Sequence, residues 1–229
     1  MDSYLTQFKH RNRELCQKCF GDPSLLKKEA KDFPAIVAKF QSQAKKDTQS
    51  LGNKETDHEV CFAALLEELG FQFLLKKKKG DHLKLLPSIA NGLYYIYQVN
   101  GSQQSLDFQT ILVYEHKIVC SITYDLKHTT SDTFYLNDGW FLENIVYVIT
   151  HQRATTTKTL IALGQHIPSE EEKQAYAKIA EAKKQLNSEK DNTSSSLIVT
   201  YRFANRYKCS KFTDEWSTHR LNEVMTFLT

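Results

Sequence analysis

The chain has 229 residues, of which 41% are apolar and 25% are charged, a composition typical of globular proteins. Its 30 basic and 27 acidic residues leave a formal net charge of +3, too small to indicate a nucleic-acid or anionic-membrane partner by itself. No apolar stretch approaches the roughly 20 residues that span a bilayer, and the first residues lack the apolar region of a secretory signal. We therefore expect a soluble cytoplasmic protein without membrane insertion, and export by a non-classical route stays open. Five cysteines, an odd number, favour free thiols over a disulfide framework.

The beginning of the chain carries helical patterns. Leu5 and Phe8 begin an apolar stripe at helical spacing, and a second apolar pattern is interrupted at Pro34, where a new helix starts. Helices of this length bury little apolar surface alone. We therefore expect residues 1–50 to form a helical subregion that packs on the sheet of a single domain covering residues 1–229.

The middle of the chain changes from helical to strand patterns. After a strong helix near residues 57–70, aromatic and β-branched runs are separated by Gly, Asn and Asp, which is typical of antiparallel strands. Residues 115–117 predict a tight hairpin turn or a strand start. Residues 140–150 fit a strand or a helix, and a strand is favoured. The other predicted strands are residues 72–77, 84–86, 92–99, 108–115, 117–124 and 133–136.

The last third of the chain mixes helices with one strand. Ser169 and Glu172 have the spacing of a capping box and predict a helix start. The polar residues 187–196 predict a mobile loop, followed by a strand at 197–203 and a helix from about Asp214. Helices, then strands, then helices indicate an α+β fold with a largely antiparallel central sheet, not a doubly wound parallel one.

Cys61 is the first candidate for chemistry, because it lies in the opening turn of the helix near residue 57. Backbone N–H groups and the helix dipole at such a position can lower a thiol pKa and make it a nucleophile. His116 has the parity of the apolar face of the following strand, so it is the candidate base. Asp132 is the candidate group that orients the imidazole, with Asn137 and Asp138 as alternatives. The three residues predict a cysteine-dependent hydrolase or acyl transferase as one possible function.

The chain order of these residues, Cys61, His116 and Asp132, is similar in outline to that of papain-like and transglutaminase-like enzymes. In those enzymes a nucleophile helix precedes a sheet that carries the His and the Asp or Asn. The resemblance covers only this order and the Cys61 helix, since no Trp or Gly stands beside Cys61 and no extended motif is present.

A simpler interpretation of the cysteines is core packing. Cys61 shares an apolar stripe with Leu65 and Leu69, where cysteine behaves as a small hydrophobe. Cys16 and Cys19 have the spacing of a metal or redox motif, but structural zinc needs four ligands and a redox pair usually begins a helix after a strand. The sequence therefore indicates no metal and no cofactor.

Two further functions follow from exposed patterns. Basic residues Arg202, Arg206 and Lys208 alternate with aromatic residues and can track a nucleic-acid backbone, which makes weak nucleic-acid binding an alternative. The aromatic run from Tyr94 to Tyr97 is a candidate recognition surface for another protein. Because the chain carries no catalytic signature, the favoured prediction is a non-enzymatic protein-interaction or regulatory module, with another protein as partner.

Overall fold

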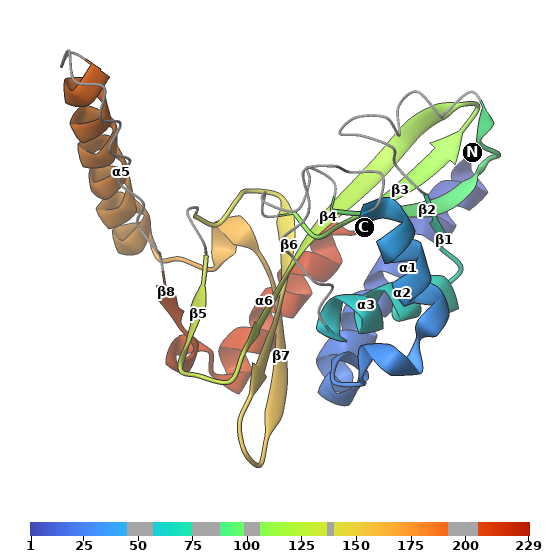
Figure 1. The fold of residues 1–229 in the computed structure, drawn as a ribbon, viewed down its shortest axis with the longest axis horizontal. Helices are drawn as coiled ribbons and strands as arrows, with labels where there is room; N and C mark the ends of the chain where they lie inside the picture. Colours follow the sequence, from blue (N-terminus) through green and yellow to red (C-terminus); the bar gives the residue numbers. More distant parts are fainter. Residues whose placement is uncertain (45–56, 75–87, 99–105, 137–139, 192–205) are drawn as a thin grey trace.

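The fold is described by a computed structural model that covers residues 1–44, 57–74, 88–98, 106–136, 140–191 and 206–229. Helices of the N-terminal part lie on one face of a mixed sheet, and a long helix projects from the opposite end of the molecule (Figure 1). The α-helices are α1 (Asp2–Gly21), α2 (Pro34–Ala44), α3 (Asp57–Glu68), α5 (Glu170–Asp191) and α6 (Asp214–Phe227). Short 3-10 turns are η1 (Pro23–Leu26), η2 (Ala30–Asp32), η4 (Gly164–His166) and η5 (Cys209–Lys211).

The central sheet has six strands in the order β1-β2-β3-β4-β6-β7, and β5 pairs with β8 in a separate ribbon. Three neighbouring pairs are antiparallel, but β1 is parallel to β2 and β4 is parallel to β6. The mixed α and β character and a mostly antiparallel sheet are confirmed, and the sheet is mixed because two of its neighbouring pairs are parallel. The strands are β1 (Gln72–Phe73), β2 (Gly92–Tyr97), β3 (Phe108–Tyr114), β4 (Lys117–Thr129), β5 (Thr133–Tyr135), β6 (Ile145–Gln152), β7 (Thr157–Leu163) and β8 (Arg206–Lys208).

The parallel pairing of β4 and β6 has a simple cause. Between them the chain forms β5, which pairs with β8 instead of returning beside β4. The chain therefore re-enters the central sheet in the direction in which β4 left it. Spacing of apolar residues carries no information about this detour, since a strand pattern is the same for both pairing directions.

The tight turn between β3 and β4 is confirmed. Glu115 and His116 have φ values of 49° and 59°, and Tyr114 faces Lys117 in the register. Two successive residues with positive φ are the backbone requirement of a two-residue hairpin whose twist matches its strands. Beyond the turn, β4 continues to Thr129, five residues past the predicted end.

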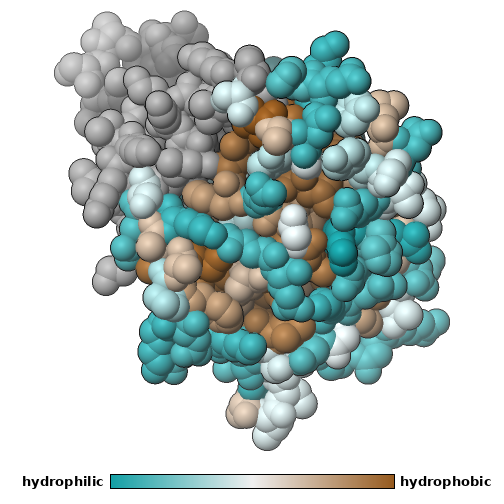
Figure 2. Space-filling model, turned by 90° about the vertical axis from the view of Figure 1, so that its right-hand side faces the viewer, coloured by the Kyte–Doolittle hydropathy of each residue, from teal (hydrophilic) through white to brown (hydrophobic). Residues whose placement is uncertain are grey.

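One apolar core joins the N-terminal helices to the sheet. Phe8 and Leu15 of α1 belong to the same buried cluster as Tyr95 and Val148 of the strands. A buried polar contact fixes this packing: Asn12 Oδ1 accepts hydrogen bonds from Thr110 Oγ1 at 2.8 Å and from Tyr124 Oη at 2.7 Å. From the side on which α1, α2 and α3 lie, the surface is mostly hydrophilic with apolar patches between the polar residues (Figure 2). The helices thus cover the sheet as predicted, while the single-domain boundary stays a prediction.

The C-terminal third follows the prediction at its helix starts and departs from it between them. Ser169 N donates to Glu172 Oε2 at 3.0 Å and Glu172 N donates to Ser169 Oγ at 3.3 Å, so the capping box is present. Helix α5 continues to Asp191, so the first part of the predicted loop 187–196 is helical. The rest of that loop and the predicted strand 197–203 lie outside the described residues. Among the described helices, none has both the length and the apolar character needed to cross a membrane.

Candidate binding pocket beside strand β7

Cys61 is a buried core residue. Its side chain is 1% exposed, and its Sγ donates to the carbonyl oxygen of Lys28 at 3.1 Å. Burial raises the pKa of the Cys61 thiol to about 11. This outweighs the helix-start effect, which is worth at most about 2 kcal/mol and is further offset here by the acidic Asp57 one turn earlier. The nucleophile required by a cysteine enzyme is therefore a neutral thiol near neutral pH.

The structure does not bring His116 to Cys61. His58, one helical turn before Cys61, stacks on His128 near the end of β4, with ring centroids 5.5 Å apart. His116 precedes the start of β4, and at about 3.3 Å per residue the length of that strand separates it from His128 by roughly 40 Å. Asp132 lies on the surface beyond β4 and pairs with Arg153. The predicted Cys61, His116 and Asp132 arrangement is not assembled, and the alternatives Asn137 and Asp138 lie outside the described residues.

The other residues that the sequence analysis named as candidate sites are, where the structure describes them, buried in the core or in ordinary surface positions. Tyr94, Tyr95 and Tyr97 are all buried, so the prediction that this aromatic run forms an exposed recognition surface is wrong. Arg206 lies over the Tyr135 ring at 4.5 Å, Lys208 is exposed, and Arg202 falls outside the described residues. Cys16 and Cys19 are buried, and burial raises the pKa of both thiols. Within the described part of the chain no cluster of His, Cys, Asp and Glu is suited to a metal ion.

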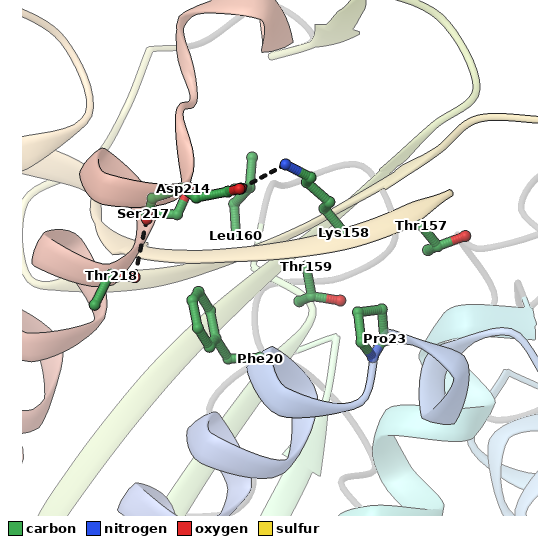
Figure 3. A pocket seen from close by; sticks show the side chains of 9 residues that line it. All are labelled: Phe20, Pro23, Thr157, Lys158, Thr159, Leu160, Asp214, Ser217 and Thr218. Carbon is green, nitrogen blue, oxygen red and sulfur yellow. Dashed lines mark hydrogen bonds and ion pairs between the residues drawn. The ribbon is translucent and has the colours of Figure 1, made fainter. Parts of the chain in front are cut away.

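A pocket that sequence reasoning did not find lies between β7, the end of α1 and the start of α6 (Figure 3). Its volume is about 270 Å³, and it is partly open to solvent. A cavity of about 150 Å³ already holds benzene, so this pocket has room for a branched or aromatic side chain, yet it falls below the roughly 300–1,000 Å³ of drug-sized sites. It is lined by Phe20, Pro23, Thr157, Lys158, Thr159, Leu160, Asp214, Ser217 and Thr218.

The strand pattern explains how β7 serves both the core and the pocket. Ile161 and Leu163 belong to the core under α1, so Thr157 and Thr159, with the same parity, also point to that side. Lys158 points the other way and pairs with Asp214 at the beginning of α6. The two sides of the strand therefore contribute different chemistry to one pocket.

Thr159 carries the most informative polar atom of the pocket. The residue is 3% exposed, and its Oγ1 is buried with no hydrogen-bond partner among the described residues. By contrast, Thr157 Oγ1 accepts from Lys27 Nζ at 2.8 Å, and the hydroxyls of Ser217 and Thr218 donate to carbonyl oxygens of their own helix at 2.7 and 2.9 Å. A buried hydroxyl without a partner costs about 1–3 kcal/mol. The wall of the pocket therefore includes a residue whose buried hydroxyl has no partner in the described part of the chain, beside apolar side chains.

A second pocket lies on the other side of α6, between that helix and the start of α5. Its volume is about 280 Å³, and Phe212 and Trp216 form an aromatic wall. Its charged groups are already paired: Lys211 contacts Glu172, and Arg220 donates to both carboxylate oxygens of Glu223. The first pocket is the stronger candidate because its unsatisfied group is an uncharged hydroxyl, and a ligand that binds beside it loses less hydration free energy than one that binds beside charged groups.

Comparison of the chain with protein-family models, with curated proteins and with solved structures finds no match. The candidate site therefore depends on the geometry of this chain alone. A signal for it was present in the sequence: Thr157 and Thr159 extend the parity of Ile161 and Leu163, so two hydroxyls continue an inward apolar stripe. The stripe alone does not reveal that α1 and α6 leave a gap there.

Proposed function

We propose that this protein is a non-enzymatic protein-interaction module that takes an apolar side chain of a partner protein into the pocket beside β7. The observation that carries the proposal is the buried hydroxyl of Thr159, which has no hydrogen-bond partner among the residues that the structure describes and belongs to the wall of an apolar pocket. A partner group with a nearby carbonyl or amide satisfies this hydroxyl, while its aliphatic part displaces water from Phe20 and Leu160. Both contributions are gained only on binding.

The alternatives receive less support from the geometry. A cysteine hydrolase needs an accessible thiolate near a base, and Cys61 is sealed in the core far from His116. Nucleic-acid binding would depend on the exposed residues Arg206 and Lys208. Among the described residues, Tyr135 is the one exposed aromatic ring that contacts Arg206, so a single ring is present there for stacking on a base. Of the two pockets, the one beside β7 has the more apolar wall and an uncharged hydroxyl without a partner among the described residues.

N-acetyl-leucine amide is a suitable probe, because it joins one branched side chain to two amide groups. We expect millimolar binding, seen as concentration-dependent amide shifts of Thr159 and Ser217 in nuclear magnetic resonance spectra. Thr218→Trp fills the pocket from α6 and should abolish these shifts. Thr226→Trp is the matched control, since Thr226 is also exposed on α6 and donates to the carbonyl four residues earlier at 3.0 Å, but lies outside the pocket.

Either of two results contradicts the proposal. The first is the absence of shifts at Thr159 with about 10 mM probe, a concentration at which even a weak specific site is substantially filled. The second is equal loss of binding in Thr218→Trp and Thr226→Trp, which would place the binding away from the pocket.

A further inference from the structure

We infer that the second pocket, which lies between α6, η5 and the start of α5, binds a small aromatic carboxylate: one planar ring with one anionic group. The site is separate from the pocket beside β7, and the inference does not depend on the proposed function. Its volume of about 280 Å³ is nearly twice the roughly 150 Å³ that hold benzene. It is below the roughly 300–1,000 Å³ of drug-sized sites, so a ring with a short substituent fits best.

The aromatic wall of the pocket already carries two cations of the protein itself. Phe212 contacts both Tyr207 and Trp216, with ring centroids 5.8 Å and 4.6 Å apart. Lys211 Nζ lies over the Tyr207 ring at 5.4 Å, and Arg220 Cζ lies over the Trp216 ring at 5.3 Å. The faces of aromatic rings attract cations, but here a further cation would be repelled by these two. The wall therefore disfavours a cationic ligand and suits an anionic one.

The lining of the pocket has more positive than negative charge. Among the residues that line it, Lys211 and Arg220 are cationic and Glu172 is the one acid. His166 adds a further positive charge when it is protonated. A carboxylate that enters the pocket therefore meets an excess of cationic groups.

Lys211 is available to a ligand because its acidic partner has other donors. Glu172 pairs with Lys211, and its Oε2 also accepts hydrogen bonds from Ser169 N at 3.0 Å and from Tyr207 Oη at 2.7 Å. Both of these bonds remain when Lys211 turns away. The Lys211 side chain is 50% exposed, and ion pairs at such positions contribute little to stability. A ligand carboxylate thus replaces Glu172 as the partner of Lys211 at a small cost.

Arg220 has donors to spare while it stays bound to its own partner. Its Nη1 donates to the two carboxylate oxygens of Glu223 at 2.8 Å and 2.7 Å. The same carboxylate also lies 3.0 Å from His166 Nδ1 and 3.5 Å from His219 Nε2. A guanidinium has five N–H donors, and Nη2 of Arg220 has no hydrogen bond to a described residue. Arg220 can therefore donate to a ligand without leaving Glu223.

Two further acids near the pocket are directed to other groups. Glu170 pairs with Lys173, and Glu171 accepts a hydrogen bond from Ser169 Oγ at 2.7 Å. Neither acid belongs to the lining. They reduce the positive potential around the pocket but do not contact a ligand inside it.

The apolar part of the lining requires a ring and not an anion alone. Ile167 and Pro168 are buried and line the pocket together with Phe212. An inorganic anion would leave these surfaces in contact with water, whereas a planar ring covers them and gains hydrophobic free energy. The ring therefore supplies affinity and the carboxylate supplies specificity.

The test compares ligands of nearly the same shape on the full chain. We expect phenylacetate to bind with a Kd of about 1 mM, seen as concentration-dependent shifts of the Trp216 indole N–H and the Ser169 amide in nuclear magnetic resonance spectra. The neutral phenylacetamide should bind about tenfold more weakly, because it lacks the charge that Lys211 and Arg220 recognise. Neither 2-phenylethylammonium nor acetate should cause these shifts at about 10 mM. High salt should weaken binding of phenylacetate and leave that of phenylacetamide unchanged.

A pair of protein variants gives an independent readout. Lys211→Gln removes a cation of the lining and should weaken phenylacetate binding about fivefold or more, with no change for phenylacetamide. Lys208→Gln is the matched control, since Lys208 is an exposed lysine three residues earlier that does not line the pocket. It should change the binding of phenylacetate less than about twofold.

Three results would overturn the inference. The first is the absence of shifts at Trp216 with about 10 mM phenylacetate. The second is equal binding of phenylacetate and phenylacetamide, or equal effects of Lys211→Gln and Lys208→Gln, which would remove the anion from the recognition. The third is equal binding of acetate and phenylacetate, which would remove the ring. None of them affects the binding of N-acetyl-leucine amide beside β7, so the two sites stand or fail separately.

One further ligand distinguishes two sources of the same chemistry. N-acetyl-phenylalanine carries the ring and the carboxylate as the last residue of a peptide does. Binding at least as tight as that of phenylacetate supports the site as one for the C-terminal aromatic residue of a chain. Exclusion of this ligand, with phenylacetate still bound, supports it as a site for a free aromatic acid.

Discussion

Replacing Thr159 with valine should stabilise the free protein, which is unusual for a change in a buried residue. Valine has nearly the same shape, so no cavity forms, and it lacks the hydroxyl that is buried without a partner. The removed desolvation cost is about 1–3 kcal/mol, and β-branched valine also suits a strand. For a chain of this size, a gain of 2 kcal/mol raises Tm by about 4–8 °C.

The matched control is the same substitution at Thr110. This residue is also fully buried on a central strand, but its Oγ1 donates to Asn12 Oδ1 at 2.8 Å. Thr110→Val leaves that acceptor with one donor fewer and should lower the free energy of unfolding by about 1–2 kcal/mol. The two valine variants should therefore shift Tm in opposite directions, measured by differential scanning calorimetry at one pH.

A lowered or unchanged Tm for Thr159→Val would refute the reasoning. It would mean that the hydroxyl has a partner in solution, ordered water included, and that the pocket carries no unmet hydrogen bond. The expected stabilisation should be accompanied by about tenfold weaker binding of N-acetyl-leucine amide, because the hydrogen bond gained on binding is lost. A gain in stability at the expense of binding is typical of residues retained for function.

Three further changes test other parts of the structure. Cys61 should resist alkylation at pH 8 until denaturant is added, because its pKa is raised to about 11 by burial; mass spectrometry showing the rate of a free thiol would contradict this. Burial raises the pKa of Asp125 to about 8, so the folded state keeps a proton that the unfolded state releases near pH 4. The free energy of unfolding should therefore fall as the pH rises from about 4 to about 8. Asp125→Asn should flatten this fall, as measured by urea titrations at several pH values. Asn12→Ala should cost about 2–4 kcal/mol, since two buried hydroxyls lose their acceptor, and adding Tyr124→Phe should cost less than the sum of the single changes.

Local signals in the sequence predicted local structure well. The capping box at Ser169, the tight turn at His116 and the break at Pro34 each depend on residues adjacent in the chain, and each is present. The parallel pairing of β4 with β6 depends on where the intervening chain travels, which periodicity does not encode. Strand β4 is longer than predicted. The prediction stopped at residue 124 because the charged residues Asp125 and Lys127 interrupt the apolar pattern, but these two residues pair with each other and the strand continues.

The candidate site shows the same division. Cys61 lies in the predicted helix, but it is the fifth residue of α3 and not part of its opening turn. The alternative of core packing, which its spacing from Leu65 also indicated, is the one that the structure supports. The pocket was not predicted, since it exists only where α1, α6 and β7 meet, and these elements are far apart in the sequence. Its polar feature, the inward Thr159, becomes meaningful only when the three-dimensional surroundings show that no neighbour bonds to it.

Lys158 and Asp214 form an exposed ion pair between β7 and the start of α6, beside the pocket. Asp214→Asn removes this pair and should lower the free energy of unfolding by at most about 1 kcal/mol, with a smaller effect at high salt, because exposed pairs are weak and screened by ions. Glu215→Gln, which removes a neighbouring acidic residue in the same exposed first turn, is the control for the charge of the α6 start itself. An equal change in the two variants would show that the loss comes from the charge at the helix start and that the ion pair with Lys158 contributes nothing.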